Sequence, residues 1–282
     1  MADGVAGACL AVGAGARAEP GRVALALACS LCLFLFGMSQ NDLADRNRDR
    51  ITRPERPLPS GALSLRGARI VVFSTALLAG GLGVLAGPPG CWLVLGMLLL
   101  ISLYNLSPGH MGPVGPVLLG SIRAANLLLA AVLLAAPWAA LAPALGYGLY
   151  IGLVSSAARM EDGEVTSSAK RLAWRLRLAQ LLAGLAPALV FLGPGRPTLL
   201  SLAVAWLVSL LCVSFLETRL RGLLRQETLE ASRIAPLIGC YLGGIFLFDA
   251  SLALAAGVWP AGALLLILFP ASRALANRFP AS

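Results

Sequence analysis

Residues 22–61 read RVALALACSLCLFLFGMSQNDLADRNRDRITRPERPLPSG, and their character changes at position 41. The first part, 22–40, is apolar apart from Arg22 and a few uncharged polar residues, and about 20 such residues cross a bilayer as one helix. From Asp42 onward, acids and arginines follow one another closely. We therefore predict a membrane span that ends in a charged segment at the membrane edge.

The same apolar character extends along the whole chain. Of its 282 residues, 58% are hydrophobic and 12% are charged, whereas a soluble domain carries about 25% charged residues. So few charges cannot cover the surface of a soluble protein, and so much hydrophobicity excludes a disordered chain. The sequence therefore predicts an all-α protein, a polytopic transmembrane helical bundle.

Apolar windows predict nine to ten spans within a single membrane-embedded domain that comprises residues 1–282. The first window is short and rich in Gly and Ala, so that 1–18 is expected to be a short or clipped first helix. The last window predicts an additional C-terminal span at 258–275. The windows lie at about 4–18, 22–40, 67–87, 90–104, 115–136, 139–158, 174–193, 197–216, 234–256 and 258–275.

Basic residues gather on one side of the predicted topology. If the loop 41–66 is cytoplasmic, all but four of the 22 Lys and Arg residues fall on that side, as is typical of cytoplasmic loops. The four exceptions are Arg17, Arg22, Arg123 and Arg196. We therefore expect an integral multi-pass protein of a bacterial-type inner membrane, with candidate site loops at 41–66 and 159–173 that carry the acidic clusters and face the cytoplasm. Aromatic residues do not interleave with these basic residues, so the net charge of +9 does not indicate a nucleic-acid partner.

Four polar residues at the start of the charged segment have the spacing of one helix face. Asn41, Asp45 and Asp49 follow one another at intervals of four, and Asp42 lies three residues before Asp45. Carboxylates so close together need a neutralising cation, and Mg²⁺ binds a few carboxylates together with substrate phosphates. The neighbouring arginines suit phosphate as well. The segment predicts a magnesium-bridged diphosphate site, and the alternative is a solvated charged loop that ends a span.

The order of residues from Asn41 to Gly61 resembles the first signature of the UbiA family of membrane prenyltransferases. Met111-Gly-Pro, followed by Arg123-Ala-Ala-Asn126, is similar to the pattern of that family's fifth span. The resemblance implies a helical bundle around a central cavity that opens to the cytoplasmic side of the lipid bilayer. It also implies a polyprenyl diphosphate donor, Mg²⁺ as cofactor, and prenyl transfer to an acceptor that the sequence leaves unidentified.

The resemblance assigns three roles to residues of this chain. The catalytic role falls on Asp42, Asp45, Asp49 and Arg123. Substrate binding falls on Asn41, Arg53, Arg56, Asn126 and Arg159, with Arg53 and Arg56 in the loop that caps the site. Metal binding falls on Asp42, Asp45, Asp49, Glu161 and Asp162.

The second acidic cluster departs from the family pattern. The family carries a second Asp-x-x-x-Asp type of signature after its sixth span, whereas position 158, four before Asp162, is Ala in this chain. Glu161, Asp162 and Glu164 would still supply oxygen ligands. Two other interpretations stay open: a catalytically inactive homologue that binds isoprenoid, and a membrane transporter, which is typically built from inverted repeats.

Three further features of the apolar windows and loops fit no motif of the predicted site. Asp249 is an acid inside a predicted span and is left unassigned. His110 either contacts the acceptor or is solvated. Cys29 and Cys32 form a lone CxxC inside a span, and we expect both to be small buried hydrophobic residues.

Overall fold

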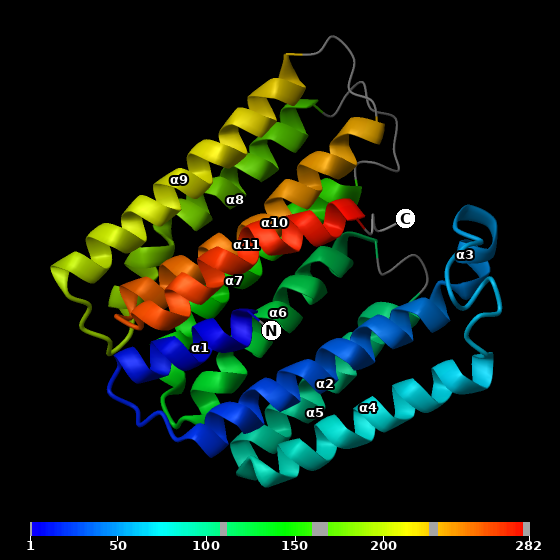
Figure 1. Ribbon diagram of the computed structural model, residues 1–282, viewed down its shortest axis with the longest axis horizontal. Helices are drawn as coiled ribbons and strands as arrows, with labels where there is room; N and C mark the ends of the chain where they lie inside the picture. Colours follow the sequence, from blue (N-terminus) through cyan, green and yellow to red (C-terminus); the bar gives the residue numbers. More distant parts are fainter. Residues whose placement is uncertain (1, 108–111, 160–168, 226–230, 279–282) are drawn as a thin grey trace.

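The computed structural model describes residues 2–107, 112–159, 169–225 and 231–278, and every regular element in these ranges is a helix. Successive long helices run antiparallel in one bundle (Figure 1). This confirms the predicted fold class. In chain order the helices are α1 (Ala2–Gly13), α2 (Pro20–Ala44), α3 (Arg46–Thr52), α4 (Leu65–Leu85), α5 (Gly87–Leu106), α6 (Gly115–Leu133), α7 (Pro137–Ala158), α8 (Ala169–Leu189), the 3₁₀ turn η4 (Val190–Leu192), α9 (Leu199–Leu224), α10 (Ala231–Ala255) and α11 (Trp259–Arg278).

Eight of the described helices are long and apolar enough to cross a membrane. Two more are apolar but shorter: α1 and the part of α11 from Trp259 to Ala271. A bilayer core needs about 20 residues of helix. The sequence predicts nine to ten spans. The two shorter helices account for the difference between that number and the eight long helices.

The outer surface of the bundle is apolar. Large side chains such as Phe73 and Leu77 on α4, and Leu199 on α9, are exposed. Soluble monomers rarely expose so large an apolar surface, whereas lipid tails would cover it. Trp92 and Trp138 are exposed near the starts of α5 and α7, as expected of aromatic residues at a membrane interface.

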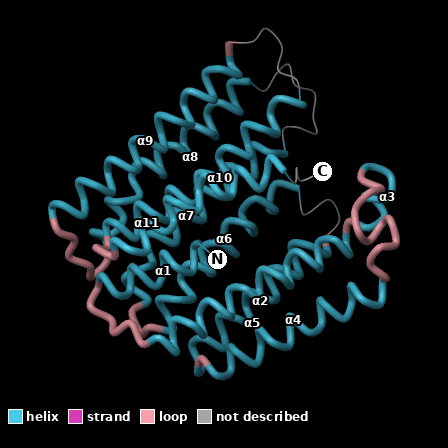
Figure 2. Tube along the Cα trace, viewed as in Figure 1, coloured by secondary structure: helices cyan, strands magenta, loops and turns pink. Residues whose placement is uncertain are grey.

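The charged segment begins inside a helix. α2 extends to Ala44, and α3 begins only one residue later, after Asp45. Asp45 keeps nearly helical angles (φ −80°, ψ −3°), and its backbone N–H donates to the carbonyl of Asn41. The predicted loop 41–66 is therefore helical in its first part, and its irregular part is the stretch 53–64 before α4 (Figure 2). We name the end of the bundle that carries α3 the α3 end.

Small residues allow neighbouring helices to approach closely. A Cβ atom added to Gly120 on α6 would lie 2.3 Å from the carbonyl oxygen of Gly148 on α7. One added to Gly7 on α1 would lie 1.9 Å from the carbonyl oxygen of Leu127 on α6. Close contact through small residues is the common way in which helices associate inside a membrane. These close contacts hold α6 and α7 together and pack α1 against α6.

The α6–α7 contact provides a first testable prediction. The variant Gly120→Ala is expected to lower the free energy of unfolding by about 1–3 kcal/mol, because its methyl group must push the two helices apart. Gly96→Ala on α5 is the matched control, since a Cβ atom there meets no atom within 4 Å. Thermal unfolding in detergent compares the two variants. Equal melting temperatures would contradict the tight contact at Gly120.

Candidate functional site

Arg56 joins two carboxylates of the charged segment. Its Nη1 lies 2.9 Å from Asp49 Oδ2 and 3.8 Å from Asp42 Oδ1. The Asp49 side chain is only 6% exposed, whereas that of Asp42 is 52% exposed. The stretch 53–64 folds back from α3 to place the guanidinium there. The structure therefore brings together Asp42, Asp49 and Arg56, which the sequence assigned to one site.

A cavity of about 340 Å³ opens beside these three side chains, and we name it the mouth cavity. Its wall consists of Asp42, Asp49 and Arg56, the hydroxyl residue Ser39, and apolar residues from α2, α4 and the stretch between α3 and α4. The volume lies within the range of about 300–1,000 Å³ that is usual for small-molecule sites. The mouth cavity thus offers both negative and positive charge to a ligand at the α3 end.

Asn41 and Asp45 form a separate pair. Asn41 Nδ2 donates to Asp45 Oδ2 at 3.2 Å, so these two residues share a helix face as their spacing predicts. Asp45 is absent from the described lining of the mouth cavity, whereas Asn41 lines a second, deeper cavity. The polar residues at the end of α2 therefore border two neighbouring cavities.

The donor set of the mouth cavity fits magnesium only in part. Among the described residues, no three Asp, Glu, His or Cys side chains lie close enough together to hold one metal ion. Asp42 and Asp49 still supply two carboxylates on one wall. Mg²⁺ usually binds through one or two carboxylates and takes its other ligands from water and substrate phosphates. The residues fit a magnesium ion that binds together with a diphosphate, and they do not form a preassembled cage.

The deeper cavity, which we name the central cavity, has a volume of about 170 Å³ and lies between α2, α5 and α6. Most of its lining is apolar, including Leu33, Phe34 and Met97. Met38 lines both this cavity and the mouth cavity, so the two spaces are neighbours. A largely apolar cavity therefore adjoins the charged mouth.

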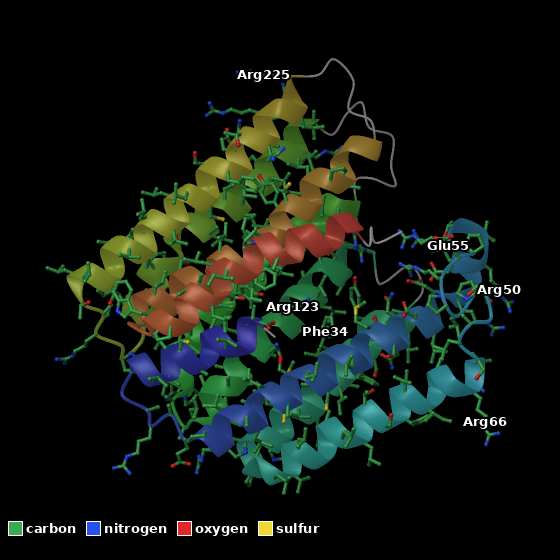
Figure 3. All side chains as sticks on the ribbon, viewed as in Figure 1. Phe34, Arg50, Glu55, Arg66, Arg123 and Arg225 are labelled. Carbon is green, nitrogen blue, oxygen red and sulfur yellow. The ribbon has the colours of Figure 1, made fainter. Side chains whose placement is uncertain are left out.

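The central cavity has a polar lower end, which we name the floor and which consists of Ser30, Arg123 and Asn126. Ser30 precedes Asn41 by eleven residues, which corresponds to about 16 Å along α2. In Figure 3, Arg123 lies in the middle of the bundle, well away from Arg50 and Glu55 at the α3 end. Arg123, which the sequence assigned to catalysis, is therefore at the far end of the chamber from the carboxylates.

Two contacts between distant segments build the floor. Arg123 Nη1 lies 3.4 Å from Oδ2 of Asp3 on α1, and the Asp3 side chain is 1% exposed. Asn126 Nδ2 donates to Ser30 Oγ at 2.9 Å. The Oδ1 atom of Asn126 is buried and has no hydrogen-bond partner among the described residues. The floor is thus held in place by α1, α2 and α6 together.

The remaining predicted residues lie elsewhere or outside the described part. Arg53 is exposed. Arg159, at the end of α7, donates to the backbone carbonyl of Gly112 before α6. Glu161, Asp162, Glu164 and His110 lie outside the residues that the structure describes. The assignment of metal or substrate binding to the second acidic cluster therefore stays a prediction.

Sequence reasoning missed two groups of residues. Asp3 and Ser30 were not assigned to the site, although an acid in an apolar helix is a functional signal in itself. Asn105 on α5, which lines the central cavity, donates to the Gly37 carbonyl and to Gln40 Oε1 and so ties α5 to α2. No local sequence pattern predicts that contact.

Of three residues that the motifs left aside, two are buried and one is partly exposed. Asp249 on α10 is fully buried, and neither of its carboxylate oxygens has a hydrogen-bond partner among the described residues. Cys29 is fully buried and Cys32 is partly exposed, and both are free thiols. Burial as a small hydrophobic residue is therefore confirmed for Cys29, and Cys32 is only partly covered.

Comparison with known sequences gives a match over most of the chain. The model of the UbiA prenyltransferase family matches residues 4–235. A digeranylgeranylglyceryl phosphate synthase of Natronomonas pharaonis is 41% identical over 66 residues, which cover 23% of each chain. The naringenin 8-dimethylallyltransferase 2 of Sophora flavescens is 32% identical over 77 residues, which cover 27% of this chain and 19% of that protein. The matches thus span about a fifth to a quarter of the length of these curated relatives.

Comparison with solved structures shows the same fold. The apo structure of a UbiA homolog from Aeropyrum pernix K1 aligns with a TM-score of 0.64 at 17% identity and covers 89% of this chain and 95% of that one. A structure from a study of digeranylgeranylglyceryl phosphate synthase in membranes aligns with a TM-score of 0.59 at 16% identity and covers 90% and 91%. At such low identity the likeness concerns the helical architecture alone.

Proposed function

Because this chain belongs to the UbiA prenyltransferase family, we propose that it transfers a prenyl group from a polyprenyl diphosphate to an acceptor within a membrane. One observation carries the proposal: Arg56 and the two carboxylates that it joins, Asp42 and Asp49, line a cavity that leads to an apolar chamber. A polyprenyl diphosphate has the same division into a charged head and an apolar chain. The diphosphate would occupy the mouth cavity.

The chemistry requires that charge be stabilised as the donor breaks. The bond between the prenyl C1 and the diphosphate oxygen is cleaved, and its electron pair leaves with the diphosphate. Magnesium bound at Asp42 and Asp49 would neutralise part of the charge that builds on the leaving group. Arg56 would turn from the carboxylates to the phosphate oxygens, which a guanidinium binds with two parallel hydrogen bonds.

The acceptor completes the reaction from the side of the central cavity. Its nucleophilic atom forms the new bond to C1 and gives up its proton to an oxygen of the departing diphosphate. Leu33, Phe34 and Met97 line the chamber, and an apolar wall keeps water away from a carbon with cationic character. This protection favours transfer to the acceptor over hydrolysis of the donor.

We expect donor binding to depend on magnesium. Geranylgeranyl diphosphate should bind the purified protein at micromolar concentration with Mg²⁺ and about tenfold or more weakly in chelator, because the carboxylates then repel the diphosphate. Titration calorimetry in detergent measures both affinities. Geranylgeraniol, which lacks the diphosphate, is the control and should bind equally with and without Mg²⁺. Equal affinities of the diphosphate in the two conditions would overturn the proposed site.

A second measurement, the release of diphosphate after an acceptor is added, separates the proposal from its main rival. A catalytically inactive homologue would bind the donor and retain it uncleaved with every acceptor supplied, whereas a transferase releases diphosphate. We also propose that the mouth cavity faces the cytoplasm of a bacterial-type cell. The support is the excess of arginine on α3 and on the stretch that follows it.

A further inference from the structure

A groove between α8 and α9 lies apart from the mouth and central cavities, and we name it the outer groove. Its volume is about 660 Å³, and its described lining comes from α8 except for Leu224 near the end of α9. Trp174 and Leu181 in this lining are exposed, so the groove opens on the outer surface of the bundle. Because successive long helices run antiparallel, α8 begins and α9 ends at the α3 end (Figure 1). The outer groove therefore lies at one edge of two neighbouring spans.

The lining residues of α8 follow a regular order. Lys170, Trp174, Arg177, Leu178 and Leu181 are three or four positions apart, so that they share one face of the helix. The two cations lie in the first nine residues of α8, and the two leucines follow them into the span. Leu181 comes eleven residues after Lys170, which corresponds to about 16 Å along the helix. The groove therefore changes from basic at the membrane edge to apolar inside the span.

The basic end of the groove carries a surplus of positive charge. Arg177 Nη2 lies 3.5 Å from Glu217 Oε1 on α9, and Arg221 Nε lies 2.7 Å from the same oxygen. Lys170 forms no ion pair within the part of the chain that the structure describes. Three cations therefore face one carboxylate, and the surplus charge attracts an anion.

The start of α8 has the opposite charge from the one that a helix favours there. The N-terminus of a helix stabilises acidic side chains and disfavours cations, yet residues 169–177 contain four basic residues and no acidic one. Arg175 points to α7, where its Nη1 donates to the carbonyl of Ser156 at 2.7 Å. Lys170 and Arg177 instead line the outer groove. A bound anion would offset this unfavourable pattern, since anions bind well at the start of a helix.

The two parts of the groove together indicate which kind of anion fits. A soluble anion would leave Leu178 and Leu181 uncovered, because they lie inside the span. A second copy of this chain, docked by two-fold symmetry, would place the same basic face against itself. An anionic lipid satisfies both parts, since its phosphate is at the membrane edge and its acyl chain extends inward. Basic pockets between spans are known to bind such headgroups, and Trp174 has the interfacial position that is usual for tryptophan.

We propose that the outer groove binds one anionic phospholipid. Its phosphate contacts Lys170 and Arg177, which donate hydrogen bonds to phosphate oxygens, and one acyl chain lies along Leu178 and Leu181. Such a lipid joins α8 to the end of α9 at the membrane edge. The site shares no lining residue with the mouth cavity or the central cavity, so the proposal is independent of the transferase activity.

The test uses the full chain in nanodiscs of phosphatidylcholine that contain a minor share of phosphatidylglycerol. Bromine atoms, which quench tryptophan fluorescence on contact, are placed on the acyl chains of one lipid or the other at equal mole fraction. The variant Trp174→Phe isolates the signal of Trp174 from that of the other tryptophans. Brominated phosphatidylglycerol is expected to quench Trp174 about fivefold more efficiently than brominated phosphatidylcholine, the preference that one effective basic residue provides.

The variant that combines Lys170→Gln with Arg177→Gln should reduce this preference close to one. The matched control combines Arg66→Gln with Arg69→Gln, which removes two exposed cations from the start of α4 at the same end of the bundle (Figure 3). The control should retain most of the preference. Lys170→Gln alone, which breaks no described ion pair, should lose part of it and tests the site even if the double variant is unstable.

Three results would overturn the proposal and leave the transferase function standing. The first is an equal preference for the two lipids in the wild-type protein. The second is an equal loss in the two double variants, which would show a general attraction to the basic end of the bundle. The third is displacement of the brominated lipid by soluble glycerol 1-phosphate, which would show that the groove binds a free phosphate compound.

Discussion

Replacement of Asp49 by asparagine is expected to lower prenyl transfer about 100-fold, the usual cost of losing one charge-stabilising group from an active site. Asp49 is the buried carboxylate of the mouth cavity. Its side chain is 6% exposed, and its Oδ2 atom lies 2.9 Å from Arg56 Nη1. The amide keeps the shape of the side chain but removes the charge that would attract magnesium and orient Arg56. The donor should bind more weakly, and its affinity should respond less to Mg²⁺.

The measurement is the release of diphosphate over a range of Mg²⁺ concentrations. Glu55→Gln is the matched control, because it removes one negative charge from the same stretch at an exposed position. It is expected to change the rate by less than about threefold, as exposed charges contribute little. If Asp49→Asn leaves turnover and the response to Mg²⁺ nearly unchanged, Asp49 is not part of the site.

Loss of Asp3 is expected to have the largest effect on stability. The variant Asp3→Leu leaves Arg123 with an uncompensated charge in the interior of the bundle. Removal of one partner of a buried ion pair costs about 3–5 kcal/mol. The lower end of that range is expected here, because Arg123 also borders the central cavity. Thermal unfolding in detergent should show the loss directly.

A double variant distinguishes the ion pair from simple packing. Asp3→Leu combined with Arg123→Met replaces both charges by apolar groups, which is often neutral for stability. It should recover most of the melting temperature that Asp3→Leu loses. A double variant less stable than Asp3→Leu would show that the two residues act independently.

Local composition determined the architecture of this protein. A span requires about 20 apolar residues in succession, so the sequence by itself located the eight long helices and identified the charged segment after α2. The spacing of Asn41 and Asp45 likewise predicted their contact, because helix geometry alone brings positions four apart together. Two further apolar helical segments, Ala2–Gly13 and Trp259–Ala271, are shorter than a full span, so the ninth and tenth predicted spans stay predictions.

Tertiary structure alone decided which polar residues meet. Asp3 and Arg123 are 120 positions apart, and Ser30 and Asn126 are 96 apart, yet both pairs are in contact. Such contacts depend on how helices cross, and helix crossing is set by the close approach of residues such as Gly7 and the Leu127 backbone, not by any local pattern. The return of Arg56 to Asp42 and Asp49 depends in the same way on how the chain folds back after α3. The sequence therefore specified the chemical groups of the site, and the tertiary packing separated them into a charged mouth and a polar floor.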